Sequence, residues 1–201
     1  IGPAGVAATS IPVDDFTNHR WESWSDPVLV TPENADDKDA ALLDRKVNDK
    51  YVFFHRVGGI NLCLDYLNTL DFEKEKIDRC TQVLAPRLGM WDSLKVGLSG
   101  PPIETEHGWL MIYHAVSPVH NRYRISAALL DLDDPSVVIS RAADPLFEPE
   151  TVYEKEGIVP DVVFPCGAVV HDDTSYIYYG GADLVTGVAT MKLSTILNAL
   201  K

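Results

Sequence analysis

The chain has 201 residues and a mass of 22.2 kDa, and its 46% apolar and 23% charged residues suit one soluble domain and exclude general disorder. Lys and Arg total 17 against 30 Asp and Glu, so the net charge of −13 argues against a general affinity for nucleic acid or for an anionic membrane. No stretch approaches the roughly 20 apolar residues that span a bilayer.

The cysteines are few and the histidines are scattered. Cys63, Cys80 and Cys166 are an odd number without a CxxC pair, so we expect reduced thiols and a cytoplasmic location rather than a disulfide framework or a zinc site. The histidines have no metal-ligand spacing, and the sequence contains no GxSxG, Walker, HExxH or GxGxxG motif. We therefore expect no metal and no resident cofactor.

Short β-rich runs alternate with turn residues along the chain. In chain order, we expect a short helix over 36–43, strands over 51–57, 109–116, 123–132, 162–170, 175–180 and 187–193, and a helix over 194–200. Glycine and proline, 13 of each, punctuate these runs. Many short strands at regular spacing are typical of an all-β sandwich, barrel or propeller.

An internal repeat favours the propeller. A turn followed by an aromatic-rich strand recurs with its lead aromatics at Tyr51, Trp109 and Tyr176, spaced by 58 and 67 residues. A second strand, rich in small and aliphatic residues, recurs with spacings of 56, 64 and 61 residues. Its equivalent positions are Ala8, Leu64, Ala128 and Ala189. A period of about 60 fits a four-stranded blade with long loops. An irregular β-sandwich with chance similarity between its strands is the alternative.

The second repeat unit occurs four times and the first only three times, because the copy at Ala8 has no aromatic strand before it. We infer that the chain begins inside a blade. The expected architecture is an all-β propeller, incomplete at the N-terminus, with residues 1–201 in a single domain. An unclosed propeller leaves open blade edges, which give it a physical reason to form a homo-oligomer.

Three cationic side chains could meet at one end of this propeller. Arg56 and His114 occupy equivalent tail positions of successive aromatic strands, and Lys95 precedes a loop of small residues and two prolines. Arginine offers a bidentate fork and lysine a point charge for an oxyanion such as phosphate. Taken singly, Arg56 could instead be salt-bridged, His114 a satisfied inner histidine and Lys95 a surface residue.

Other residues near these loops are less specific. Phe164 could be a core residue or a platform for the C–H face of a sugar ring, and we interpret Cys166 as a small buried hydrophobe rather than a nucleophile because no base lies beside it. No catalytic carboxylate pair can be selected by counting. The acidic residues nearest the loops are Asp39, Asp92, Glu104, Asp161 and Asp183.

Ordered motifs along nearly the whole chain resemble glycoside hydrolase family 130, the β-mannoside phosphorylases and related β-mannosidases. The strongest are residues 95–103 (KVGLSGPPI), 108–114 (GWLMIYH), 123–135 (YRISAALLDLDDP), 149–167 (PETVYEKEGIVPDVVFPCG) and 178–183 (YYGGAD), with 32–34, 38–42 and 55–56 upstream. The resemblance implies a five-bladed β-propeller. It also implies inverting chemistry, in which phosphate attacks the anomeric carbon of a β-mannoside and yields α-mannose 1-phosphate.

The same resemblance implies a set of site residues. Phosphate, the co-substrate, would be bound by residues that resemble the family's phosphate binders: Arg56, Lys95, His114 and Tyr123. The mannose subsite would be lined by three others: Asp39, Phe164 and Asp183. A dianionic nucleophile needs such cations to approach an oxocarbenium-like centre in an otherwise acidic site. Beyond carbohydrate and phosphate, no nucleic-acid or membrane partner is expected.

Two departures from the family pattern matter. The family's general acid is the aspartate of an Asp-Pro-Arg motif, and no Asp-Pro-Arg occurs in this sequence, so we expect that acid upstream of Ile1 and no catalytic residue in this chain. The phosphorylases also carry a further arginine near 35–39, where this chain has Lys38.

We therefore predict a β-mannoside phosphorylase whose 201 residues alone are weakly active or inactive. An inverting β-mannosidase of the same family is one alternative, and a non-catalytic sugar-binding propeller fragment is another.

Overall fold

A computed structural model describes residues 2–119 and 121–201; Ile1 and His120 lie outside the described residues. Within this part of the chain, a short strand pair is followed by three larger antiparallel sheets. The N-terminal arm (residues 2–36) contains β1 (Ala7–Ala8), α1 (Val13–Thr17), the 3-10 turn η1 (Trp21–Ser23) and β2 (Val28–Leu29). The all-β class is therefore confirmed.

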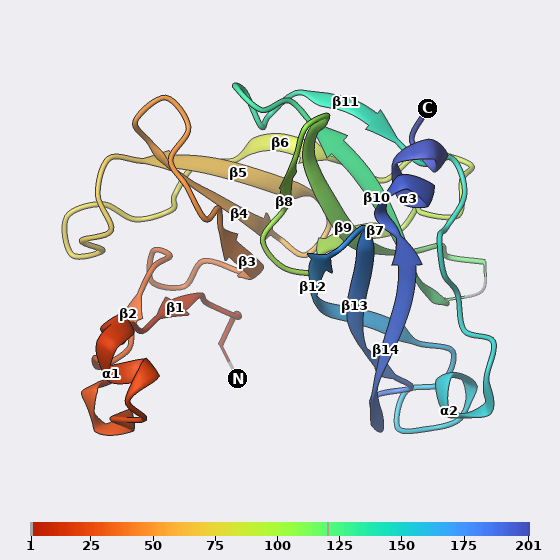
Figure 1. Ribbon diagram of the computed structural model, residues 1–201, viewed down its shortest axis with the longest axis horizontal. Helices are drawn as coiled ribbons and strands as arrows, with labels where there is room; N and C mark the ends of the chain where they lie inside the picture. The colour runs from red at the N-terminus through yellow and green to blue at the C-terminus, as the bar shows by residue number, and fades with distance from the viewer. Residues whose placement is uncertain (1, 120) are drawn as a thin grey trace.

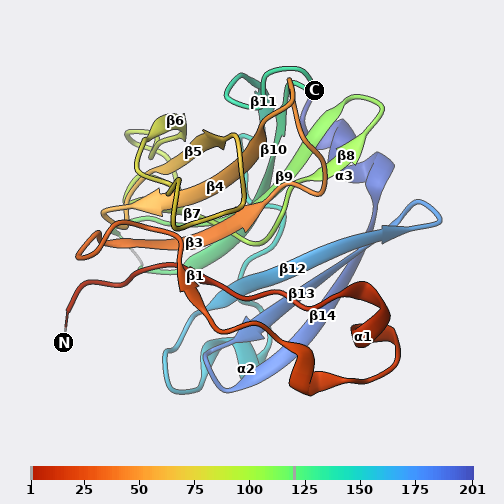
Figure 2. The same ribbon diagram turned by 90° about the vertical axis from the view of Figure 1, so that its left-hand side faces the viewer.

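Sheet I has the order β3-β4-β5-β6. Sheet II has the order β11-β10-β9-β7, with β8 also paired to β9, and sheet III has the order β12-β13-β14. Their bounds are β3 (Asp37–Leu42), β4 (Tyr51–Val57), β5 (Leu62–Leu67), β6 (Thr81–Leu84), β7 (Lys95–Leu98), β8 (Ile103–Thr105), β9 (Gly108–Val116), β10 (Tyr123–Leu130), β11 (Val138–Arg141), β12 (Val163–His171), β13 (Thr174–Gly181) and β14 (Val185–Lys192), with α2 (Val152–Lys155) before sheet III and α3 (Leu193–Ala199) after it. Sheet II lies between sheets I and III (Figure 1), and Figure 2 shows sheet III running beneath the other two.

The sequence repeat corresponds to one hairpin in each sheet. The aromatic unit forms β4, β9 and β13, and the small-residue unit that follows it forms β5, β10 and β14. The positions taken as equivalent also occupy matching places in the register, because Leu64 faces Phe54, Ala128 faces Met111 and Ala189 faces Ile177. The repeat is therefore structural.

Strand β9 is the centre of the core, and all nine of its residues are buried. Its alternate residues face opposite sides, as the period of two in a strand requires. Trp109, Met111 and Tyr113 join an apolar cluster with sheet I, whereas Leu110 and Ile112 join a second cluster with sheet III and α3. This two-sided burial explains why the run reads as continuously apolar rather than alternating.

The helix expected over 36–43 is wrong, because these residues form the edge strand β3. The pairing of β3 with β4 shifts register between Lys38 and Ala41, and Asp39 in this bulge has a φ of 52°. A left-handed residue interrupts a right-handed helix, and the mixed apolar spacing there reflects the bulge. The C-terminal helix is confirmed as α3, one residue earlier than expected.

Two expectations about cysteine are also wrong. Cys63 on β5 and Cys80, which directly precedes β6, form a disulfide with Cα atoms 5.0 Å apart, because the β5–β6 pairing brings them together. Cys166 is exposed rather than buried. The register shift between Pro165 and Gly167 makes it the unpaired residue of a bulge in β12.

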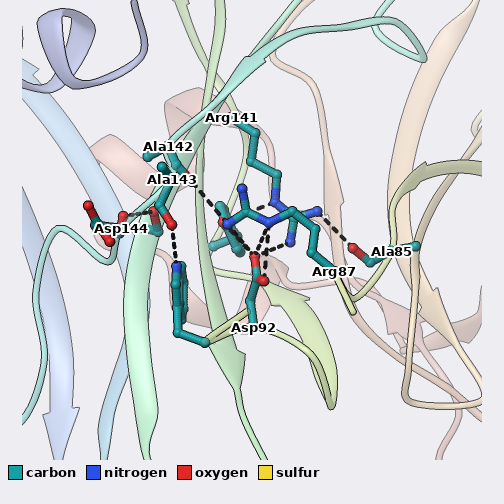
Figure 3. Close-up of polar contacts among 10 residues, drawn as sticks. Ala85, Arg87, Asp92, Arg141, Ala142, Ala143 and Asp144 are labelled. Atoms are coloured by element: carbon teal, nitrogen blue, oxygen red, sulfur yellow. Dashed lines mark hydrogen bonds and ion pairs between the residues drawn. The ribbon is translucent and has the colours of Figure 1, made fainter. Parts of the chain in front are cut away.

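A buried charge cluster joins the loop before β7 to β11 (Figure 3). Asp92 is fully buried and accepts hydrogen bonds from Arg87 Nε at 2.8 Å and Arg141 Nη2 at 2.6 Å. The two guanidinium groups also donate to backbone carbonyls, Arg87 to Ala142 and Arg141 to Ala85. The cluster thereby fixes the entry to β7, where Lys95 begins.

None of the helices in residues 2–119 and 121–201 combines the length and apolarity needed to cross a membrane.

Candidate functional site

Three of the predicted site residues, one from each of strands β3, β4 and β9, meet at the junction of sheets I and II. The Nη1 atom of Arg56 lies 3.1 Å from Oδ2 of Asp39 and 3.2 Å from Nε2 of His114. Arg56 and His114 are buried, and Asp39 is nearly so. Because a guanidinium can only donate, Nε2 of His114 accepts this hydrogen bond, which places the ring proton on Nδ1.

The bulge in β3 is what directs Asp39 into the site. A regular strand would alternate its side chains across the sheet, whereas the extra residue at the bulge re-aims one of them. Aspartate is among the few non-glycine residues that accept the positive φ of 52° found here. Lys38, at the position where the phosphorylases carry an arginine, lies alongside Gly59, whose added Cβ would be 3.6 Å from its Nζ.

Gly97 on β7 makes room for this cluster, and sequence reasoning did not single it out as essential. It pairs with His114 in the register, and a Cβ built on it would lie 2.3 Å from Cε1 of His114 and 2.4 Å from Oδ2 of Asp39. Both atoms belong to groups held by other contacts. The only signal in the sequence was its place in the 95–103 motif.

We expect Gly97→Ala to destabilise the fold by about 2 kcal/mol, because the methyl group must displace His114 and Asp39 from a filled space. Gly167→Ala is the matched control, because a Cβ at Gly167 meets nothing within 4 Å. Urea unfolding of both variants checks this. Equal stability of the two variants would show that the cluster at Gly97 is loosely packed.

Next to this cluster lies a group of aromatic residues. The Nζ atom of Lys95 is hydrogen-bonded to the hydroxyl of Tyr123 and lies 4.7 Å from the centre of its ring. The ring of Phe164 lies 4.3 Å from that of His114 and 6.1 Å from that of Tyr123. The backbone N–H of Tyr123 donates to the carbonyl of Asp161, which ties β10 to the segment before sheet III.

A cavity of about 330 Å³ opens against this aromatic group. It is lined by Tyr123, Val159, Val162, Phe164 and Asp183. Asp183 lies in the turn between β13 and β14 with a φ of 54°. The structure therefore brings all seven predicted site residues to one region, with Arg56, Asp39 and His114 at its buried end and Asp183 at the cavity.

The charges at the buried end are balanced by an unprotonated histidine. Burial, together with the Arg56 and Lys95 cations, lowers the pKa of His114 to about 3, so its ring is neutral near pH 7. Burial raises the pKa of Asp39, and Arg56, Lys38 and Lys95 oppose this shift. Among the described residues, Arg56 Nε and His114 Nδ1 are buried without a hydrogen-bond partner. Unpaired donors beside two cations suit an oxyanion.

The depressed pKa of His114 predicts acid sensitivity. The unfolded chain binds a proton at His114 below a pH of about 6.5, whereas the folded chain does so only near pH 3. Stability should therefore fall as the pH is lowered from 6.5 to 5, by up to about 1.4 kcal/mol per pH unit. Asp39, whose pKa is raised, contributes in the opposite direction at lower pH, so the window stops at 5.

Urea unfolding at several pH values checks this prediction. The pH slope of the stability should be smaller in His114→Gln and unchanged in the control His107→Gln, since His107 is an exposed histidine. A slope of equal size in His114→Gln would mean that another group titrates in this window.

The sequence comparisons agree with this geometry. A family model of glycoside hydrolase family 130, described as β-1,4-mannooligosaccharide phosphorylase, matches residues 17–201. A 1,2-β-oligomannan phosphorylase of Thermoanaerobacter sp. (strain X514) is 47% identical over 162 residues, which are 79% of this chain and 52% of that protein. A β-1,2-mannobiose phosphorylase of Listeria innocua is 38% identical over 202 residues, 98% of this chain and 54% of that protein.

Solved structures are similar over the same region. The complex of the Listeria innocua β-1,2-mannobiose phosphorylase with β-1,2-mannobiose has a TM-score of 0.77 at 37% identity, covering 88% of this chain and 50% of that chain. A putative glycoside hydrolase of Bacteroides ovatus has a TM-score of 0.75 at 25% identity, covering 99% and 63%. The chain spans about half the length of the curated relatives it matches. On the match over residues 17–201, the chain belongs to glycoside hydrolase family 130.

Proposed function

We propose that this chain carries the phosphate- and mannose-binding part of an inverting β-mannoside phosphorylase. The observation that carries the proposal is the buried Arg56–His114 contact with unpaired donors, next to a cavity lined by an aromatic ring and a carboxylate. The names of relatives at 38–47% identity support it, because each is a β-mannobiose or β-oligomannan phosphorylase.

In this proposal the two ends of the site divide the substrates. Arg56 and Lys95 supply positive charge to phosphate, Tyr123 supplies a hydroxyl, and neutral His114 supplies the Nδ1 proton as a hydrogen-bond donor without adding charge. Asp183 and Asp39 accept hydrogen bonds from sugar hydroxyls, and Phe164 packs on the face of the ring.

The reaction itself is an inverting displacement. An oxygen of phosphate forms a bond to the anomeric carbon, the bond to the leaving oxygen breaks, and that oxygen takes a proton from a general acid. The products are α-mannose 1-phosphate and a shortened acceptor. None of the residues assigned above is the acid, and the sequence contains no Asp-Pro-Arg.

The hydrolase alternative receives less support. Lys38 in place of an arginine favours it, but the remaining cations are together and the relatives above 35% identity are phosphorylases. A binding fragment without turnover is separated from both enzymes only by an activity measurement.

We also propose that residues 1–201 belong to one five-bladed propeller domain. Sheets I to III are successive antiparallel units with the site residues converging between them, as blades around a channel would be. The outer face of sheet III exposes Val169, Tyr178 and Val188, which a neighbouring blade would bury.

A cytoplasmic location remains part of the proposal, although the Cys63–Cys80 disulfide weighs against the reduced thiols on which it rested. The acidic charge gives no support to a nucleic-acid partner.

The test has two stages. Calorimetry with inorganic phosphate, and separately with β-1,2-mannobiose, should show saturable binding of each; absence of both would overturn the proposal. The chain is then incubated with α-mannose 1-phosphate and mannose. Phosphate release with formation of a mannoside supports a phosphorylase, whereas release of mannose from mannobiose in phosphate-free buffer would show a hydrolase.

A further inference from the structure

Arg56 is held from behind by a buried carboxylate that no part of the proposed reaction uses. The Oδ1 atom of Asp37 accepts the backbone N–H of Arg56 at 3.1 Å and that of Lys38 at 2.8 Å. Asp37 is 2% exposed. The bulge in β3 places two residues opposite His55 and interrupts the ladder here, so a side chain takes the place of a strand carbonyl as the acceptor for Arg56.

The other oxygen of Asp37 binds the neighbour of Arg56. Oδ2 of Asp37 lies 2.6 Å from Nδ1 of His55, and Nε2 of the same ring lies 3.0 Å from the backbone carbonyl of Arg79. Both partners are acceptors, so both contacts are hydrogen bonds together only in the doubly protonated imidazolium form. A buried imidazolium beside a buried carboxylate is an ion pair that fixes its neighbours in orientation.

The far end of this chain of contacts is also fixed. Arg79 precedes Cys80, which is bonded to Cys63, and Cys63 faces His55 across β4 and β5. In addition, Oδ2 of Asp65 accepts the backbone N–H of Arg79 at 2.9 Å. The Arg79 carbonyl is therefore a rigid anchor for His55.

We propose that Asp37 and His55 are positioning residues that hold the backbone at Arg56, so that its guanidinium is presented to the oxyanion of the proposed phosphate site. This inference rests on the proposed function. It assigns a role to two residues that do not themselves contact the cavity. The alternative is that the pair merely joins β3 to β4, in which case its loss would lower stability without a selective effect on phosphate.

The test compares two substitutions of the same kind. Asp37→Asn removes the charge at the back of the site. The matched control is Glu154→Gln, because Glu154 is a second buried carboxylate that accepts backbone N–H groups and the Tyr179 hydroxyl, away from Arg56. Calorimetry measures the affinity of each variant for inorganic phosphate and for β-1,2-mannobiose, and thermal unfolding measures stability.

We expect Asp37→Asn to weaken phosphate binding about 10-fold, the size of a typical coupling between contacting residues, and to leave mannobiose binding unchanged. Glu154→Gln should lower stability and change neither affinity. If Asp37→Asn does not fold, His55→Gln is measured in its place and should weaken phosphate binding in the same direction.

Two outcomes would overturn the inference in different ways. If wild type binds phosphate and Asp37→Asn binds it equally well, or loses phosphate and mannobiose affinity together, the positioning role fails and the proposed function stands. If wild type binds no phosphate, the proposed function fails and this inference falls with it.

Discussion

Replacing Arg56 by alanine is expected to weaken the binding of inorganic phosphate at least about 100-fold, which is the cost of removing one partner from a buried, hydrogen-bonded charge pair. The loss has two causes. The guanidinium that would bind the anion is gone, and Asp39, 3.1 Å from Arg56 Nη1 in the wild type, loses its counter-ion and repels phosphate. Calorimetry with inorganic phosphate measures the change.

The second cause makes a directional prediction for the double variant. Arg56→Ala combined with Asp39→Asn should bind phosphate more tightly than Arg56→Ala alone, because the repelling carboxylate is removed. Arg20→Ala is the control, since Arg20 forms a surface ion pair with Asp15 in the N-terminal arm, 46% exposed at the arginine side chain. Unchanged phosphate affinity in Arg56→Ala would place the oxyanion elsewhere.

Replacing Asp92 by alanine is expected to lower the free energy of unfolding by about 3–5 kcal/mol. Asp92 is fully buried between Arg87 and Arg141 (Figure 3), and its removal leaves two guanidinium groups without their shared anion in the interior. Urea unfolding provides the measurement. This effect exceeds the usual one of a surface aspartate, which stays within about 0.5 kcal/mol.

Asp133→Ala serves as that surface control, because Asp133 is exposed and only its backbone takes part in the hydrogen bonds of the described residues. Asp92→Asn keeps the shape of the side chain and should be intermediate, since an amide oxygen still accepts one hydrogen bond. A loss below about 1 kcal/mol in Asp92→Ala would show that solvent reaches the two arginines.

Much of the fold was predictable because the signals are local. Aromatic strands recur with turns before them, so β4, β9 and β13 and their partners were found within one or two residues at most ends. The helix expected over 36–43 failed for a reason that is not local: pairing with β4 and the bulge at Asp39 decide the conformation, and short amphipathic runs suit either element.

The candidate site divides in the same way. The seven predicted residues came from motif resemblance and from equivalent positions in the repeat, and the structure places them together. Gly97, Asp37 and the ring contacts of His55 were not identified, because their importance depends on which atoms meet them from other strands. The pairing of Cys63 with Cys80 was missed because three cysteines carry no pairing information.

By itself, the sequence determined the all-β class, the repeat of about 60 residues, the family and the identity of the cationic residues. Each of these depends on the order and spacing of residue types, which the sequence displays directly. Only the tertiary structure decided that Arg56, Asp39 and His114 share one buried cluster, that His114 is neutral there and that Asp37 supports Arg56 from behind. Arg56 and His114 are 58 residues apart in the chain, and their contact, burial and mutual electrostatics exist only after sheets I and II pack together.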